Sequence, residues 1–106
     1  MESLFDDCNS LIELNVRNFD TSDVVSLARA FSGLRSVRYI EVSNFKTSKV
    51  KDMSYMFNSC KSMTSTDVSS FDTSLVTDMT NMFCETSIKV LDLSSFKINN
   101  VRSLMM

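Results

Sequence analysis

Three carboxylates recur along the chain at an almost constant interval. Glu41 is followed by Asp67 after 26 residues and by Asp92 after a further 25, and Asn15 holds the same place one interval earlier. Equivalent residues of a stacked repeat share a column, so these side chains would lie in one row. Like charges held side by side repel each other, which favours a counter-charged partner or a cation. The row could therefore recognise a basic protein segment.

Two other interpretations of the row remain open. A solvated face needs polar side chains even when it binds nothing, and calcium needs about six to eight oxygen ligands from a closed loop. No glycine-rich calcium repeat is present, since Gly33 is the only glycine. Tyr39 could serve as an aromatic anchor, as tyrosine often does in protein interfaces. We expect a surface for a protein partner and no metal; its candidate residues are Glu13, Asn15, Arg17, Tyr39, Glu41, Asp67 and Asp92.

Catalysis has little support in the residue types. The chain has no histidine, so neither a Cys–His nor a Ser–His pair can be built. The three cysteines are an odd number, which argues against a closed disulfide framework. Cys8 and Cys60 lie two intervals apart, which is roughly 10 Å in a stacked sheet and too far for a disulfide. We expect free thiols, no cofactor and no enzyme activity.

The carboxylates belong to a longer repeat that must position them. Residues 18–31, 44–57 and 70–83 read NFDTSDVVSLARAF, NFKTSKVKDMSYMF and SFDTSLVTDMTNMF, and 95–105 reads SFKINNVRSLM. A fixed period in the twenties is typical of a solenoid. We expect a single repeat domain over residues 1–106. Its units are a partial one at 1–10 and repeats at about 11–36, 37–62, 63–87 and 88–106, the last of them incomplete.

Each repeat is expected to contain a strand and a short helix. Residues 37–45 alternate apolar and polar side chains, as a strand with one buried face does. A polar corner follows, and its Thr47 is a good helix N-cap. Apolar residues then recur at spacings of three and four, which predicts one helix face. In the third unit these are Val50, Met53, Met56 and Phe57. The predicted fold is an α/β solenoid, a leucine-rich-repeat-type curved stack of about four strand–corner–short-helix units with a parallel sheet on the concave face.

Apolar side chains at equivalent places lead to two further expectations. One phenylalanine column should form a continuous spine through the core, and it consists of Phe19, Phe45, Phe71 and Phe96. The ends of a repeat stack need polar caps, yet apolar residues crowd both ends of this chain. They are Met1, Leu4 and Phe5 at one end and Leu104, Met105 and Met106 at the other. End-to-end self-association is therefore expected.

Several motifs resemble one known family of repeats. LDLSSF stands at residues 91–96, DMSYMF at 52–57, and FDTS at 19–22 and 71–74. This combination resembles the BspA-like leucine-rich repeat, which is also described as a repeat of mycoplasma and lactobacillus surface proteins. The resemblance implies a leucine-rich-repeat solenoid in an extracellular or cell-surface protein, where such repeats act in adhesion and protein binding.

Composition limits the remaining classes of function. The net charge is −2 with both signs interspersed, so no nucleic-acid footprint is visible. No apolar run is long enough to span a membrane, and we find no signal peptide or anchor in the chain. We expect a non-enzymatic protein-interaction module that binds a protein partner on its concave face. The alternative is a structural spacer or stalk within a longer repeat array.

Overall fold

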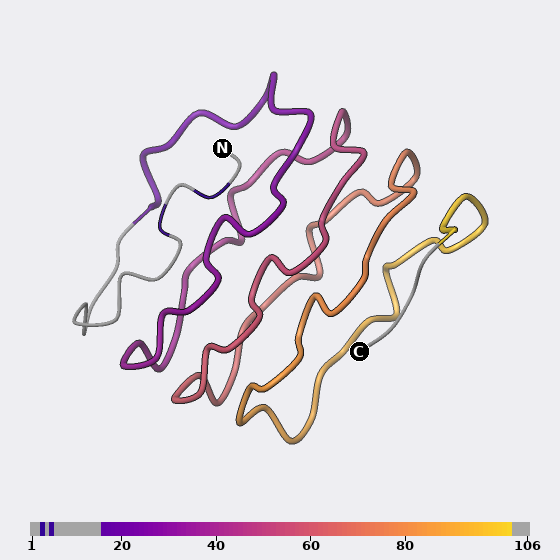
Figure 1. Ribbon diagram of the computed structural model, residues 1–106. Helices are drawn as coiled ribbons and strands as arrows, with labels where there is room; N and C mark the ends of the chain where they lie inside the picture. Colours follow the sequence, from indigo (N-terminus) through magenta and orange to yellow (C-terminus); the bar gives the residue numbers. More distant parts are fainter. Residues whose placement is uncertain (1–2, 4, 6–15, 103–106) are drawn as a thin grey trace.

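The chain forms consecutive coils that lie side by side, in the order of the sequence (Figure 1). The structure is a computed structural model, and it describes residues 3, 5 and 16–102. The radius of gyration is 12.4 Å, close to the value of about 13 Å expected for a compact domain of this length. The principal extents are 35 × 27 × 20 Å. The protein is therefore compact.

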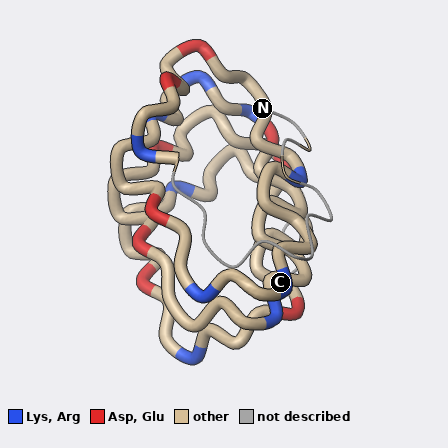
Figure 2. The backbone as a smooth tube through the Cα atoms, turned by 90° about the vertical axis from the view of Figure 1, so that its left-hand side faces the viewer, with Lys and Arg blue, Asp and Glu red and all other residues tan. Residues whose placement is uncertain are grey.

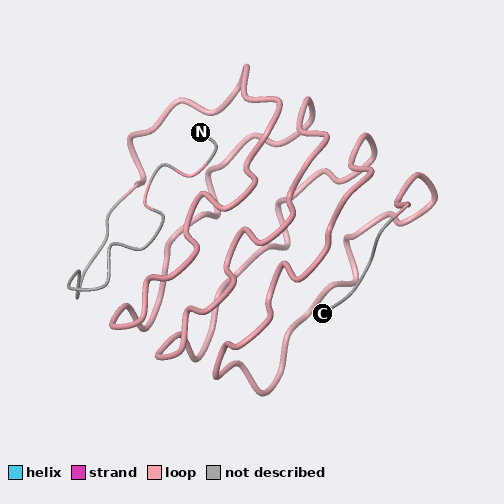
Figure 3. Cartoon of the chain, in the orientation of Figure 1, coloured by secondary structure: helices cyan, strands magenta, loops and turns pink. Residues whose placement is uncertain are grey.

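Across residues 16–102 the backbone contains neither a helix nor a strand, and Figure 3 draws it as loop throughout. Regular pairing is limited to two isolated parallel bridges, Ser26↔Asp52 and Asp52↔Asp78. Turns occupy residues 48–49 and 54–59, where a short helix was predicted. The predicted α/β solenoid of the leucine-rich-repeat type, with its parallel sheet on a concave face, is therefore wrong.

Backbone hydrogen bonds between coils explain why no helix forms. The amide of Phe31 donates to the carbonyl of Met56 at 2.9 Å, and the amide of Leu27 donates to the carbonyl of Asp52 at 2.9 Å. An α-helix would need each amide to donate to the carbonyl four residues back. The same pairing joins the next two coils, through Met53–Asp78, Tyr55–Thr80, Phe57–Met82 and Ser59–Cys84. In residues 27–33 and 53–59, every second amide thus donates to the following coil.

Two tight turns in each coil require left-handed backbone. The φ angles of Arg29, Tyr55 and Asn81 are 57°, 56° and 51°, and these residues recur every 26 positions. A second column has φ angles of 78°, 61° and 60° at Gly33, Ser59 and Glu85. Glycine adopts this region freely, whereas other residues do so at a cost. Because five of these six positions are not glycine, the glycine content could not reveal the turns.

In the inner coils, the apolar residues expected to face inward are buried. Ile40 and Val42, from the predicted strand, have no exposed surface. The residues of the predicted helix face are equally buried, namely Val50, Met53, Met56 and Phe57. The sequence pattern therefore located the core correctly, although it assigned the wrong backbone.

One column of aromatic rings runs through the core. Phe31 and Phe57 stack with ring centroids 5.6 Å apart, and the column continues to Phe5 at 5.9 Å and to Phe83 at 5.3 Å. In the column predicted as the spine, Phe71 and Phe96 stack at 6.4 Å, but Phe45 packs against Phe31 at 6.0 Å. Phe19 is 39% exposed. The continuous column is therefore Phe5, Phe31, Phe57 and Phe83 rather than the predicted one.

Buried threonines link the coils instead of capping helices. The hydroxyl of Thr21 donates to the carbonyl of Lys46 at 3.2 Å and accepts from its amide at 2.8 Å. Thr47 and Thr73 are buried in the same way. Their hydroxyls form the same pair of bonds with Asp72 and Lys97. Each threonine thus satisfies backbone groups of the next coil, which a buried hydroxyl must do to avoid an unpaired polar group.

Candidate functional site

The carboxylates of Glu41, Asp67 and Asp92 occupy equivalent places in neighbouring coils. Each is held by the serine two residues further on, which lies in the same turn. The backbone amides of these serines donate at 3.1 Å from Ser43 to Glu41, 3.0 Å from Ser69 to Asp67 and 2.9 Å from Ser94 to Asp92. The serine side chain also donates, for example from Ser69 Oγ to Asp67 Oδ1 at 2.7 Å. The three residues are called the acidic row below.

These hydrogen bonds favour the ionised form of the acidic row. Serine hydroxyl and amide groups lower the pKa of Glu41, Asp67 and Asp92 below its ordinary value, because they donate to the charged form. The negative charge of Asp92 partly offsets the lowering of the pKa of Asp67. The negative charge of Asp67 does the same to the pKa of Glu41. The carboxylates are thus near enough to interact, and all three are negative at neutral pH.

Two further predicted residues lie beside the acidic row. Tyr39 is 42% exposed. Partial burial, the charges of Glu41 and Asp67 and a hydrogen bond to Glu41 raise its pKa. Arg17 is exposed, and its charge contributes to the lowered pKa of Glu41. The row therefore has an aromatic side chain and a cation next to it.

The structure thus brings together five of the seven predicted site residues. Glu13 and Asn15 lie outside the described residues. The face that carries the five is built from turns and extended segments instead of the predicted sheet, and its serine-held carboxylates are fixed by local geometry. That these residues bind a partner stays a prediction.

A second charged column differs from the acidic row because its signs alternate. It consists of Asp20, Lys46, Asp72 and Lys97. The pKa of Asp20 is lowered mainly by hydrogen bonds from Ser22, and Lys46 contributes. Hydrogen bonds from Ser74 act in the same way on Asp72, where Lys97 contributes. Figure 2 shows that charged residues lie around the outer rim of the coils. Opposite charges in this column balance each other, whereas the acidic row carries three charges of the same sign.

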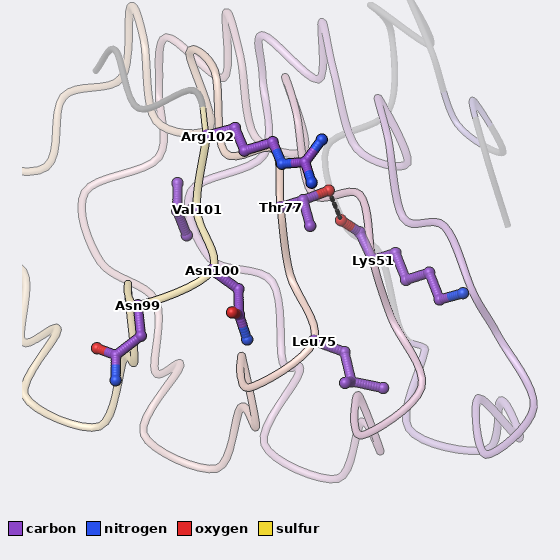
Figure 4. A pocket seen from close by; sticks show the side chains of 7 residues that line it. All are labelled: Lys51, Leu75, Thr77, Asn99, Asn100, Val101 and Arg102. Atoms are coloured by element: carbon purple, nitrogen blue, oxygen red, sulfur yellow. Dashed lines mark hydrogen bonds between the residues drawn. The ribbon is translucent and has the colours of Figure 1, made fainter.

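A pocket of about 500 Å³ lies on the flank of the last coils (Figure 4). It is lined by Lys51, Leu75, Thr77, Asn99, Asn100, Val101 and Arg102. Thr77 Oγ1 donates to the carbonyl of Lys51 at 3.3 Å, and the amide of Arg102 donates to the carbonyl of Thr77 at 2.7 Å. The two cationic side chains and two carboxamides of the lining suit an anionic ligand better than a cationic one. No thiol or carboxylate is among the lining residues. Sequence reasoning missed this pocket, although Lys51, Thr77 and Arg102 share one column of the repeat.

The described thiols are free. Cys60 is buried, and its Sγ donates to the carbonyl of Phe31 at 3.0 Å. Burial raises the pKa of Cys60 to about 11, so the thiol stays protonated at neutral pH. Cys84 is free and half-buried, and Cys8 lies outside the described residues. Free thiols were expected at both described positions, and this is confirmed.

Among the described residues, no group of three or more His, Cys, Asp or Glu side chains is placed to hold a metal ion. These residues also contain no helix long and apolar enough to cross a membrane.

One of the comparisons with known proteins finds a match. The sequence model of a family described as "Mycoplasma protein of unknown function, DUF285" matches residues 1–106. No curated protein and no solved structure matches the chain. The match covers the whole sequence, including all seven predicted site residues.

Proposed function

The chain belongs to the DUF285 family of mycoplasma proteins, and from that premise we propose that it is a non-enzymatic protein-interaction module whose acidic row binds a basic segment of a partner protein. One observation carries this proposal. The backbone amides of Ser43, Ser69 and Ser94 fix the carboxylates of Glu41, Asp67 and Asp92 at equivalent places in neighbouring coils. Local serine bonds thus hold like charges in one exposed row, where a cationic partner would relieve their repulsion.

The dimensions of the row suit an extended peptide. Neighbouring backbones joined by hydrogen bonds lie about 4.8 Å apart, so three carboxylates span roughly 10 Å. An extended chain covers that length in about three to four residues. Exposed ion pairs contribute only about 0.2–1 kcal/mol each. The affinity would therefore depend also on Tyr39, whose half-exposed ring offers an apolar contact beside the charges.

We place this module at the cell surface, where it would act in adhesion. The support is the resemblance of LDLSSF, DMSYMF and FDTS to the motifs of BspA-like surface repeats. We propose this relationship for the sequence motifs alone, because residues 16–102 do not form the leucine-rich-repeat architecture. Labelling of intact source cells with an antibody against the protein tests the location. Labelling only after the cells are permeabilised would contradict it.

Binding of a labelled peptide with alternating Lys and Ser residues tests the role of the acidic row. Fluorescence anisotropy should show binding to the wild type, and weaker binding of the matching Glu–Ser peptide. Glu41→Lys with Asp67→Lys removes two ion pairs and adds repulsion, so the dissociation constant should rise by about tenfold or more.

Asp67→Lys and Asp72→Lys form a matched pair for the same assay. Both aspartates are exposed, lie in the same coil and accept from the serine two residues on. Only Asp67 belongs to the acidic row, so only its replacement should weaken peptide binding by several-fold. Equal effects of the two substitutions would mean that net charge alone attracts the peptide, and this would contradict the proposal.

The second candidate is a structural spacer in a longer repeat array. The backbone bonds from Phe31 to Met56 and from Phe57 to Met82 favour it, because they join coil to coil without any ligand. A spacer needs only its core columns. Absence of Lys–Ser peptide binding by the wild type would favour the spacer over the interaction module.

A further inference from the structure

One column of the repeat carries charge of a single sign, opposite to that of the acidic row. It consists of Val25, Lys51, Thr77 and Arg102. The amide of Lys51 donates to the carbonyl of Val25 at 2.8 Å, and the amide of Thr77 donates to that of Lys51 at 2.9 Å. The amide of Arg102 donates to the carbonyl of Thr77 at 2.7 Å. These bonds hold the four residues side by side, and they are called the basic column below.

The basic column faces solvent in the inner coils as well as in the last described one. Val25 is 58% exposed, and Lys51 and Arg102 are exposed too. Thr77 is half-buried, and Leu75, two residues before it, is 47% exposed. The exposure of this flank therefore does not depend on what covers either end of the stack.

No neighbouring acid balances the cations of the basic column. In the column two residues earlier, Lys49 Nζ lies 2.8 Å from Asp23 Oδ1 and forms an ion pair with it. Among the described residues, Lys51 and Arg102 form no such ion pair. Both line the pocket on this flank, whose lining contains no carboxylate. The two cations therefore suit an anionic partner.

The acidic row does not supply that anion within the same copy. Ten residues and two turns, at 43–44 and 48–49, separate Glu41 from Lys51 in one coil. Neither Glu41 nor Asp67 nor Asp92 lines the pocket. The acidic row and the basic column therefore occupy different stretches of the coils.

We propose that the basic column of one copy docks against the acidic row of a second copy. This inference rests on the proposed function, because it names a partner for the acidic row. Glu41 and Lys51 lie in one coil, and Asp92 and Arg102 lie two coils further on. The two outer acids and the two cations are thus each separated by two coil intervals, roughly 10 Å. This shared spacing and the opposite charges select a second copy as the occupant, because two ion pairs form at once.

The geometry of the flank suits a row of carboxylates better than one small anion. Figure 4 shows the ammonium of Lys51 and the guanidinium of Arg102 well apart from each other. One small anion would therefore meet only one of them, whereas a row of carboxylates meets both. Asp67, in the middle of the acidic row, would face Thr77, which is neutral and adds no repulsion.

This contact is lateral and differs from the end-to-end association expected from the apolar terminal residues. Of those terminal residues, the structure describes only Phe5, which stacks on Phe31 at 5.9 Å. Lateral docking depends on exposed ion pairs, which are individually weak and which salt screens. The association should therefore be weak, and it should decrease as the salt concentration rises.

Sedimentation velocity from micromolar to millimolar protein tests the proposal. At low salt the weight-average mass of the wild type should rise with concentration, and at high salt it should rise less. Lys51→Glu with Arg102→Glu places acids against acids and should weaken association by about tenfold or more. Lys46→Glu with Lys97→Glu is the matched control, because it changes the net charge equally at exposed cations of the alternating column. The control should associate nearly as the wild type does.

A charge exchange tests the pairing of the two surfaces. Glu41→Lys with Asp92→Lys should weaken association as Lys51→Glu with Arg102→Glu does. All four substitutions together keep the net charge of −2 and make row and column complementary again, so association should recover. Circular dichroism of each variant checks that it folds. If a charge-reversed variant does not fold, Lys51→Gln with Arg102→Gln takes its place and should still weaken association several-fold.

Three results would each overturn the proposal. They are a wild type that stays monomeric at low salt, equal effects of the basic-column variant and its control, and a fourfold exchange without recovery. The Lys–Ser peptide, measured on Lys51→Glu with Arg102→Glu, separates this inference from the proposed function, because that variant keeps the acidic row. Peptide binding to it supports the proposed function even where copies do not associate, and absence of binding would contradict the proposed function itself.

Discussion

The hydroxyl of Thr47 bridges both backbone polar groups of Asp72 in the next coil, since it accepts from the amide at 2.8 Å and donates to the carbonyl at 3.1 Å. Thr47 is buried, while the side chain of Asp72 is exposed. The bond therefore lies at the boundary between the core and the charged rim. It shows how residues 16–102, which form neither sheet nor helix, satisfy their backbone through bonds that repeat about every 25 residues.

Replacement of Thr47 by valine should destabilise the protein strongly. Valine has nearly the same shape but leaves the amide and carbonyl of Asp72 unpaired, and each buried unpaired group costs about 1–3 kcal/mol. The free energy of unfolding should fall by about 2–4 kcal/mol in urea denaturation. Thr47→Ser keeps the hydroxyl and loses one methyl group, so it should cost only about 1 kcal/mol. Equal losses in the two variants would show that the hydroxyl bridge does not contribute.

Truncation of the two phenylalanine columns should have unequal effects. Phe57 is fully buried between Phe31 and Phe83, so Phe57→Ala should cost about 3–5 kcal/mol. Phe19 is partly exposed, and Phe19→Ala should cost less than about 2 kcal/mol. Midpoints of urea unfolding measure both. A larger loss for Phe19 than for Phe57 would refute the ring column described above.

Substitutions in the second left-handed column should act in opposite directions. Gly33 has a φ of 78°, so Gly33→Ala adds a Cβ where it is disfavoured and should lower stability by about 1–2 kcal/mol. Glu85 has a φ of 60° and is exposed, so Glu85→Gly should raise stability by up to about 0.5 kcal/mol after the entropy of glycine and the loss of the exposed hydrogen bond from Ser59 Oγ are counted. Thermal unfolding of both variants measures the difference. Changes of the same sign would contradict the left-handed turns.

The buried thiol of Cys60 should make stability fall at high pH. Its pKa rises from an ordinary value of 9.0 to about 11 in the folded protein, because burial disfavours the thiolate. The unfolded chain loses this proton first, so the stabilisation is complete below about pH 9 and is lost as the pH rises toward about 11. Wild type minus Cys60→Ala isolates this contribution from lysine and tyrosine titration. The difference in unfolding free energy should decline by up to about 1.4 kcal/mol per pH unit in that window, and a flat difference would contradict the burial of the thiol.

The apolar spacing predicted which side chains are buried but not how the backbone is bonded. Val50, Met53 and Met56 recur at spacings of three, which suits a helix face and suits consecutive tight turns equally well. What separates the two is the partner of each amide, and the amide of Met53 donates to Asp78 in the next coil. That choice depends on residues about 25 positions away, so no local pattern reveals it.

The sequence predicted only part of the candidate site, because the rest depends on contacts between coils. The repeat interval placed Glu41 and Asp67 in one column, and the structure has them close enough to affect each other's charge. A serine two residues after each carboxylate is a recognisable turn signal. The pocket at Thr77 depends on how the coils pack, which the interval alone does not determine.

Scalar couplings across hydrogen bonds, measured by NMR on uniformly ¹⁵N,¹³C-labelled protein, test the central claim most directly. The amide nitrogen of Phe31 should couple to the carbonyl carbon of Met56, and that of Phe57 should couple to Met82. Couplings from these amides to Leu27 and Met53, four residues earlier in each case, would instead show helices and contradict the stack of hydrogen-bonded coils.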